Sequence, residues 1–121
     1  MNGPSRVLVL GLTFKENVPD LRNSKVADLV RALGTRGHDI EVADPLADID
    51  EANALYGIAV RRDLAGAGGF DGVVGAVMHD AYRGLGGNDF DRLLNPGGLL
   101  ADIKGAWRSL TLPDGIRRWQ L

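Results

Sequence analysis

The sequence predicts a single three-layer α/β domain, in which helices cover both faces of a parallel sheet of five or six strands. Short apolar runs such as Val7–Leu10 and Gly72–Val77 alternate along the chain with segments of helical periodicity. These runs are apolar at nearly every position, which indicates strands that are buried on both faces. Strands that alternate with helices in this way are typical of parallel sheets.

The first part of the chain predicts a strand, a crossover helix and a second strand. After the strand Val7–Leu10, Ser24 is a good N-cap for a helix whose apolar residues recur at helical spacing. Gly37 is a plausible C-cap of that helix, and the next strand is predicted at Ile40–Ala43. Such a unit is right-handed almost without exception.

The rest of the chain predicts shorter elements of both kinds, separated by glycine-rich turns. Helices are expected at Asp48–Tyr56, at Asp63–Leu64 as the start of a brief one, at His79–Leu85 for a turn or two, and at Asp89–Leu94. Strands are expected at Ile58–Val60, Gly72–Val77, Leu99–Ile103 and Gly115–Leu121. Gly66–Gly69 predicts a surface turn and Asn95–Gly98 a strong break.

Composition excludes several classes of function. The net charge is −2 and no run of Lys or Arg occurs, so binding to nucleic acid or to an anionic membrane has no electrostatic support. No apolar run approaches membrane-spanning length, and no secretory signal is visible, so we expect a cytoplasmic protein. The chain has no cysteine, and His38 and His79 lack metal-ligand spacing, so no metal site is predicted.

The segment Gly11–Asn23 between the first strand and the first helix is the candidate binding loop. It has thirteen residues, whereas two to six is usual for a strand-to-helix connection. Ligands of open α/β sheets bind at the carboxyl ends of the strands, where this loop must lie. The loop holds Lys15, Glu16, Asp20, Arg22 and Asn23.

Two cations of this loop have both a functional and a structural interpretation. Lys15 has three donors that suit a phosphate or a ligand hydroxyl, but a solvated loop lysine is the alternative. Arg22 offers a planar fork that can clamp a pyrophosphate, or it pairs with Asp20 and stiffens the loop; both can hold together. Phe14 either plugs the loop into the core or takes part in binding.

Other polar residues at strand ends are predicted to be structural. Asp44 ends the second strand, where dinucleotide-binding domains place a ribose-binding carboxylate, yet it follows Gly11 by 33 residues rather than by about 20. We therefore favour a turn role for Asp44 with Pro45. His79 and Asp80 follow the central strand and are predicted to cap loops. The G-x-G-x-x-G fingerprint is absent after the first strand, so no independent NAD site of that type is expected.

One pattern is far more specific than these features. Gly11, Thr13, Phe14, Lys15, Asp20, Arg22 and Ser24 form G-x-T-F-K-x4-D-x-R-x-S, with seven fixed positions over fourteen residues. It resembles the opening of the C-terminal, UDP-binding domain of the UDP-glucose/GDP-mannose dehydrogenase family. Those enzymes oxidise the C6 alcohol of a nucleotide sugar to a carboxylate with two NAD and serve polysaccharide biosynthesis. Asn17–Lys25 looks most like the members that act on UDP-N-acetylhexosamines.

The resemblance implies a Rossmann-like domain, residues 1–121, of a larger homo-oligomeric enzyme whose N-terminal domain holds most of the NAD. By this resemblance Phe14, through its backbone, and Lys15, through its ammonium, contact the UDP-sugar. Arg22 reaches NAD across the interdomain cleft. Lys104 stands where many members carry an arginine that completes the sugar site. The family's catalytic cysteine lies upstream of this domain, so the chain alone is expected to be inactive and to need the N-terminal and central domains.

Two other classes of protein remain as alternatives. A receiver-like signalling module has a similar sheet, but it needs an acidic pair after the first strand, where this chain has Gly11 and Leu12. A free-standing α/β domain that binds a small molecule is the second alternative.

Overall fold

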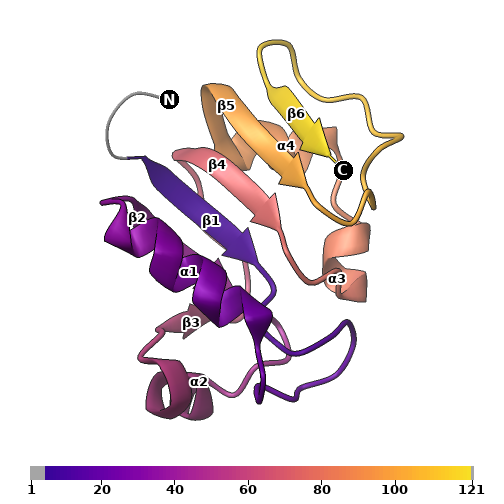
Figure 1. Ribbon diagram of the computed structural model, residues 1–121. Helices are drawn as coiled ribbons and strands as arrows, with labels where there is room; N and C mark the ends of the chain where they lie inside the picture. Colours follow the sequence, from indigo (N-terminus) through magenta and orange to yellow (C-terminus); the bar gives the residue numbers. More distant parts are fainter. Residues whose placement is uncertain (1–4, 121) are drawn as a thin grey trace.

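Six parallel strands form one sheet in the computed structural model, which describes residues 5–120 (Figure 1). The strand order is β3-β2-β1-β4-β5-β6. The strands are β1 (Arg6–Leu10), β2 (Asp39–Ala43), β3 (Val60–Arg61), β4 (Phe70–Gly75), β5 (Leu94–Asp102) and β6 (Arg117–Gln120). The helices are α1 (Lys25–Thr35), α2 (Ile49–Tyr56), α3 (Asp80–Arg83) and α4 (Gly87–Leu93). The predicted three-layer, Rossmann-like α/β fold is confirmed.

The central strand β1 is buried on both of its faces. Val7 and Val9 pack in one apolar cluster with residues of α1 and α2. Leu8 and Leu10 point to the other face and pack with residues of α3 and α4. The alternation of side chains along a strand explains why every position from Val7 to Leu10 is apolar.

The first helix begins at the predicted N-cap, and its C-cap is Arg36, one residue before the predicted Gly37. The Ser24 hydroxyl accepts a hydrogen bond from the Ala27 N–H at 3.2 Å, which caps the N-terminus of α1. The helix ends at Thr35, and Gly37 follows with a φ of +87° that favours glycine.

Other boundaries differ from the prediction. No helix forms at Asp63–Leu64, because the Asp63 carboxylate accepts from the Ala65 N–H and Arg61 donates to carbonyl oxygens of the same turn. Strand β5 begins before the predicted break at 95–98, and its pairing with β4 is irregular there. The final strand is confirmed from Arg117 onward, and Leu121 lies outside the described residues.

Candidate functional site

The carboxyl edge of the sheet joins the segments that follow β1, β2, β4 and β5. At the end of β1 the Gly11 N–H donates to Ala43 O at 2.7 Å, and the N–H groups of Ala76 and Val77 donate to Leu10 O. These bonds draw the ends of β2 and β4 against the first residues of the β1–α1 loop, residues 11–23. Residues that are distant in sequence therefore meet at this edge.

A pocket of about 360 Å³ opens at this edge. The β1–α1 loop lines it with Phe14, Lys15 and Glu16, and the first residue of α1 adds Lys25. Lys104, two residues after β5, lines it as well. The segment after β4 completes the wall with Ala76, Val77 and Met78.

The pocket brings together three of the four residues predicted to bind ligands: Phe14, Lys15 and Lys104. The idea that Phe14 plugs the loop into the core is wrong, because the residue is 51% exposed. Its backbone instead fixes the loop, since the Phe14 N–H donates to Asp20 O at 2.7 Å.

The charge of the pocket is positive. Lys15, Lys25 and Lys104 line it, and the carboxylate of Glu16 pairs with the Arg83 guanidinium at 3.1 Å. Ammonium groups around a concave surface suit a phosphate or diphosphate group. Sequence reasoning missed Lys25, although its position directly after the N-cap places it at this edge of the sheet.

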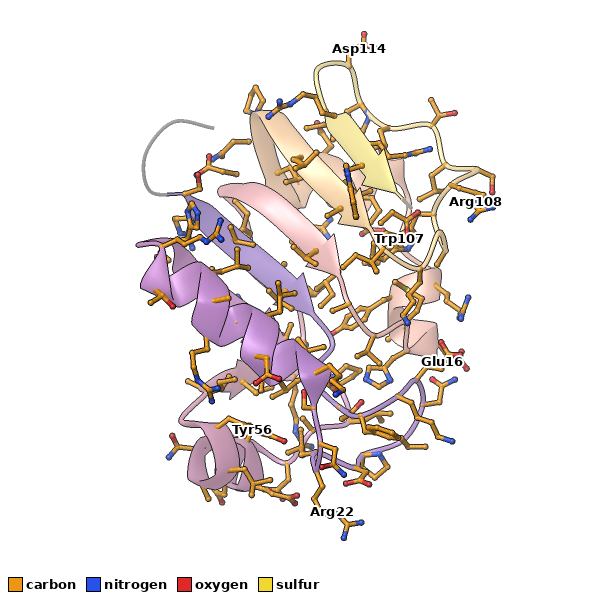
Figure 2. All side chains as sticks on the ribbon, in the orientation of Figure 1. Glu16, Arg22, Tyr56, Trp107, Arg108 and Asp114 are labelled. Atoms are coloured by element: carbon orange, nitrogen blue, oxygen red, sulfur yellow. The ribbon has the colours of Figure 1, made fainter. Side chains whose placement is uncertain are left out.

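Arg22, the fourth predicted residue, does not line the pocket. Its Nε lies 3.1 Å from Asp20 Oδ1, and its side chain is 78% exposed. Figure 2 shows Arg22 pointing away from the body of the domain. Hydrogen bonds from Arg22 lower the pKa of Asp20, and the same pairing raises the pKa of the guanidinium. The predicted ion pair is therefore confirmed, and the guanidinium remains accessible.

Asp44 has the structural role that its place before Pro45 predicts. Its Oδ1 accepts from the N–H groups of Leu46 and Ala47, which forms the turn. Its Oδ2 accepts from the N–H groups of Leu12 and Thr13 at the start of the β1–α1 loop. Both oxygens are thus satisfied by protein donors, so Asp44 is not free to bind a ribose.

The charge of Asp44 is held inside the protein by these bonds and by His79, whose Nε2 lies 2.9 Å from Oδ2. Burial alone raises the pKa of Asp44, but the hydrogen bonds from His79 and from the backbone outweigh it and lower the pKa to about 2. This contact between the ends of β2 and β4 was not predicted, because nothing in the spacing of the two residues signals it.

His79 and Asp80 cap the β1–α1 loop, as the sequence predicts. The Nδ1 of His79 accepts from the Asn17 N–H at 2.8 Å. The Asn17 side chain accepts from the Asp80 N–H and donates to the Asp80 carboxylate. The middle of the loop is thereby fixed to the segment between β4 and α3.

Two further findings concern residues 5–120 as a whole. None of the helices in this range has the length and apolar composition needed to cross a membrane. Within the same range, no group of three or more His, Cys, Asp or Glu side chains is placed to hold a metal ion.

Open parallel sheets commonly bind phosphates and nucleotides at their carboxyl edge, where this domain has its cationic pocket. The comparison with protein families is more specific: residues 8–109 match the UDP-glucose/GDP-mannose dehydrogenase family, UDP binding domain. The match covers most of the chain, and the chain belongs to this family.

Individual relatives agree with this assignment. The chain is 39% identical over 100 residues to UDP-N-acetyl-D-glucosamine 6-dehydrogenase of Pseudomonas aeruginosa, covering 83% of this chain and 24% of that protein. It is 39% identical over 115 residues to protein CapL of Staphylococcus aureus, covering 95% of this chain and 27% of that protein. The chain thus spans about a quarter of the length of these relatives.

Solved structures agree on the fold. The NDP-N-acetyl-D-galactosaminuronic acid dehydrogenase of Methanosarcina mazei Go1 superposes with a TM-score of 0.78 at 19% identity, over 97% of this chain and 24% of that one. The family assignment favours a UDP-binding domain over the receiver-like module and over a free-standing binding domain.

Proposed function

We propose that residues 1–121 are the UDP-sugar-binding domain of a larger NAD-dependent dehydrogenase, which oxidises the C6 alcohol of the sugar to a carboxylate. One observation carries the proposal: Phe14, Lys15 and Lys104, from segments far apart in sequence, line a single cationic pocket. The family match supports the same assignment, since its matched region is a UDP-binding domain.

In this proposal the lysines of the pocket bind the diphosphate and the sugar. Lys15 is a flexible point charge with three donors, which suits phosphate oxygens or ligand hydroxyls. By the family resemblance, Lys104 stands where many members carry an arginine. It offers a single ammonium rather than a bidentate fork. Because the Phe14 N–H is used within the loop, the backbone contact of Phe14 with the ligand falls to its carbonyl oxygen.

The residues of this chain do not fit an NAD site of their own. The turn after β1 lacks the glycine fingerprint, and the Asp44 carboxylate is fully occupied by protein donors. We propose that another domain holds the NAD, which accepts the hydride. Arg22, which lies outside the pocket, would contribute its guanidinium to that NAD site. The exposure of Arg22 away from the pocket supports this division of roles.

The wider context of the enzyme is also a proposal. The partners would be an N-terminal and a central domain of the same protein, in a homo-oligomer in the cytoplasm. The 39% identity to a UDP-N-acetyl-D-glucosamine 6-dehydrogenase supports a UDP-N-acetylhexosamine as substrate.

An NMR titration of the ¹⁵N-labelled chain with UDP tests the proposal. UDP should perturb amides of residues 13–16, Lys25, 76–78 and Lys104 in a saturable manner. Uridine, which lacks phosphate, should shift them far less at the same concentration. If UDP perturbs no amides, or only amides distant from these segments, the proposed function is wrong.

A further inference from the structure

We propose that His79 is a positioning residue, which as a neutral imidazole protonated on Nε2 holds Phe14 and Lys15 in the geometry that binds the nucleotide sugar. This inference rests on the proposed function of the pocket. His79 itself does not line the pocket, and its ring is 1% exposed. Its effect on the ligand would therefore pass through the β1–α1 loop.

The hydrogen bonds define which ring nitrogen carries the proton. Nδ1 accepts from the Asn17 N–H at 2.8 Å, so this nitrogen must lack a proton. The other nitrogen, Nε2, lies 2.9 Å from Asp44 Oδ2, and an ionised carboxylate can only accept. Asp44 therefore selects the tautomer that leaves Nδ1 available to Asn17, much as an outer carboxylate orients a metal-binding histidine.

The same ring contacts both ends of a five-residue segment, Thr13–Asn17. Nε2 lies 3.0 Å from the Thr13 hydroxyl, which donates to Lys15 O at 3.1 Å. At the other end, Nδ1 holds the backbone of Asn17. Phe14 and Lys15 stand between these two anchors.

Packing cannot hold this segment in place. Residues 14–17 are all exposed, so no buried apolar side chain anchors them. Asn17 has a φ of 62°, in the left-handed region, which asparagine adopts more readily than most residues other than glycine. Polar contacts must therefore hold this exposed segment. They are the Glu16–Arg83 ion pair, the bonds of the Asn17 side chain to Asp80, and the bond from the Asn17 N–H to His79.

The test compares three variants of the chain. His79→Phe keeps a planar ring but removes the acceptor and the donor. His79→Gln restores both, because its amide offers an oxygen to Asn17 and an N–H to Asp44. Arg92→Gln is a matched control at the surface of α4, where Arg92 pairs with Asp89 and neither residue lines the pocket. The readouts are UDP affinity by NMR, exchange protection of the Asn17 amide, and the ¹⁵N signature of the His79 ring.

We expect the wild-type ring to show a protonated Nε2 and an unprotonated Nδ1. His79→Phe should weaken UDP binding about tenfold through loss of preorganisation and should remove the protection of the Asn17 amide. His79→Gln should recover most of both effects, and Arg92→Gln should leave Asn17 protected. If His79 were important only for folding, His79→Phe would lower the stability of the whole domain without a selective loss of protection at the Asn17 amide.

Two results would overturn the inference. One is a wild-type ring with a protonated Nδ1, a result that requires no variant to fold. The other is UDP affinity within twofold of wild type in His79→Phe. Failure of the proposed function would give a different result, namely a wild-type chain that binds no UDP. In that case the ring signature and the protection of the Asn17 amide would still test the role of His79 in the loop.

Discussion

Gly11 lies so close to Val77 that a Cβ atom on Gly11 would stand 2.5 Å from the Cβ of Val77 and 2.6 Å from its carbonyl oxygen. Gly11 also has a φ of +98°, which favours glycine. This contact sets the β1–α1 loop against the segment after β4, and both line the pocket. Only glycine at position 11 satisfies the two requirements together.

Gly11→Ala should therefore lower the free energy of unfolding by about 3 kcal/mol, from overpacking and backbone strain together. Gly57→Ala is the matched control, because Gly57 has a φ of +67° but no atom within 4 Å of an added Cβ. It should cost only about 1 kcal/mol. Urea unfolding of both variants is the measurement. Equal losses of unfolding free energy would contradict the claim that close contact with Val77 adds to the cost at position 11.

Asp44 should make the domain sensitive to acid. Its pKa is about 2 in the folded protein against 3.8 for the free group. The ionised form therefore contributes about 2 kcal/mol of stability above pH 4, which is lost as the pH falls through about 2. Asp44→Asn should be less stable at pH 7 and should lack this acid loss. Urea unfolding between pH 6 and pH 2 measures both effects.

Asp114→Asn is the control for Asp44→Asn, since it removes one negative charge from an exposed loop. This loop lies at the opposite end of the domain from α2 (Figure 2). A pH profile of Asp44→Asn that parallels the wild type down to pH 2 would show that Asp44 does not carry the effect.

Tyr56 should stabilise the end of the β1–α1 loop. Its hydroxyl accepts from the Ser24 N–H at 3.2 Å and donates to Leu21 O. Figure 2 shows the side chain reaching from α2 toward this part of the chain. Tyr56→Phe leaves both backbone groups without this partner and should cost about 1–2 kcal/mol of unfolding free energy.

Tyr82→Phe provides the comparison for Tyr56→Phe. The Tyr82 hydroxyl is buried, and no hydrogen-bond partner for it lies among residues 5–120. Burial and the nearby negative charge of Asp44 also raise the pKa of Tyr82. Removal of this hydroxyl should leave stability unchanged or higher. Equal losses in the two variants, measured by thermal unfolding, would contradict the distinction.

The fold could be predicted largely because apolar runs and caps are local signals. Val7–Leu10 is apolar at every position, and Ser24 caps α1 through its own side chain. The failure at Asp63–Leu64 has a local cause as well, since an aspartate can form a turn in place of a helical cap.

Residues of the candidate site could be predicted only where they belong to a recognisable sequence pattern. Phe14, Lys15 and Lys104 were predicted through the family resemblance, whereas Lys25 was missed although it directly follows the N-cap of α1. The bond between Asp44 and His79 joins strands that are distant in sequence, and its existence depends on the strand order. Tertiary contacts of this kind leave no periodicity in the sequence.

The chain alone should have no dehydrogenase activity, because it has neither a cysteine nor the glycine fingerprint of an NAD site. The activity assay is NADH formation from NAD and UDP-sugars, including UDP-N-acetylglucosamine. Turnover above a blank without protein would contradict the expected inactivity.

The isolated chain should also be monomeric, or only weakly self-associating, at micromolar concentration. Light scattering measures this, and a tight dimer would contradict it.

The most direct test of the proposed site compares UDP binding to wild type, Lys15→Ala and Arg22→Ala by NMR titration. Lys15→Ala removes a charge-assisted contact of about 1.5–3 kcal/mol and should weaken UDP binding about tenfold or more. Arg22→Ala should leave UDP affinity unchanged, because Arg22 lies outside the pocket and its proposed partner is NAD. Equal weakening by the two variants, or no weakening by Lys15→Ala, would contradict the assignment of Lys15 to the nucleotide sugar.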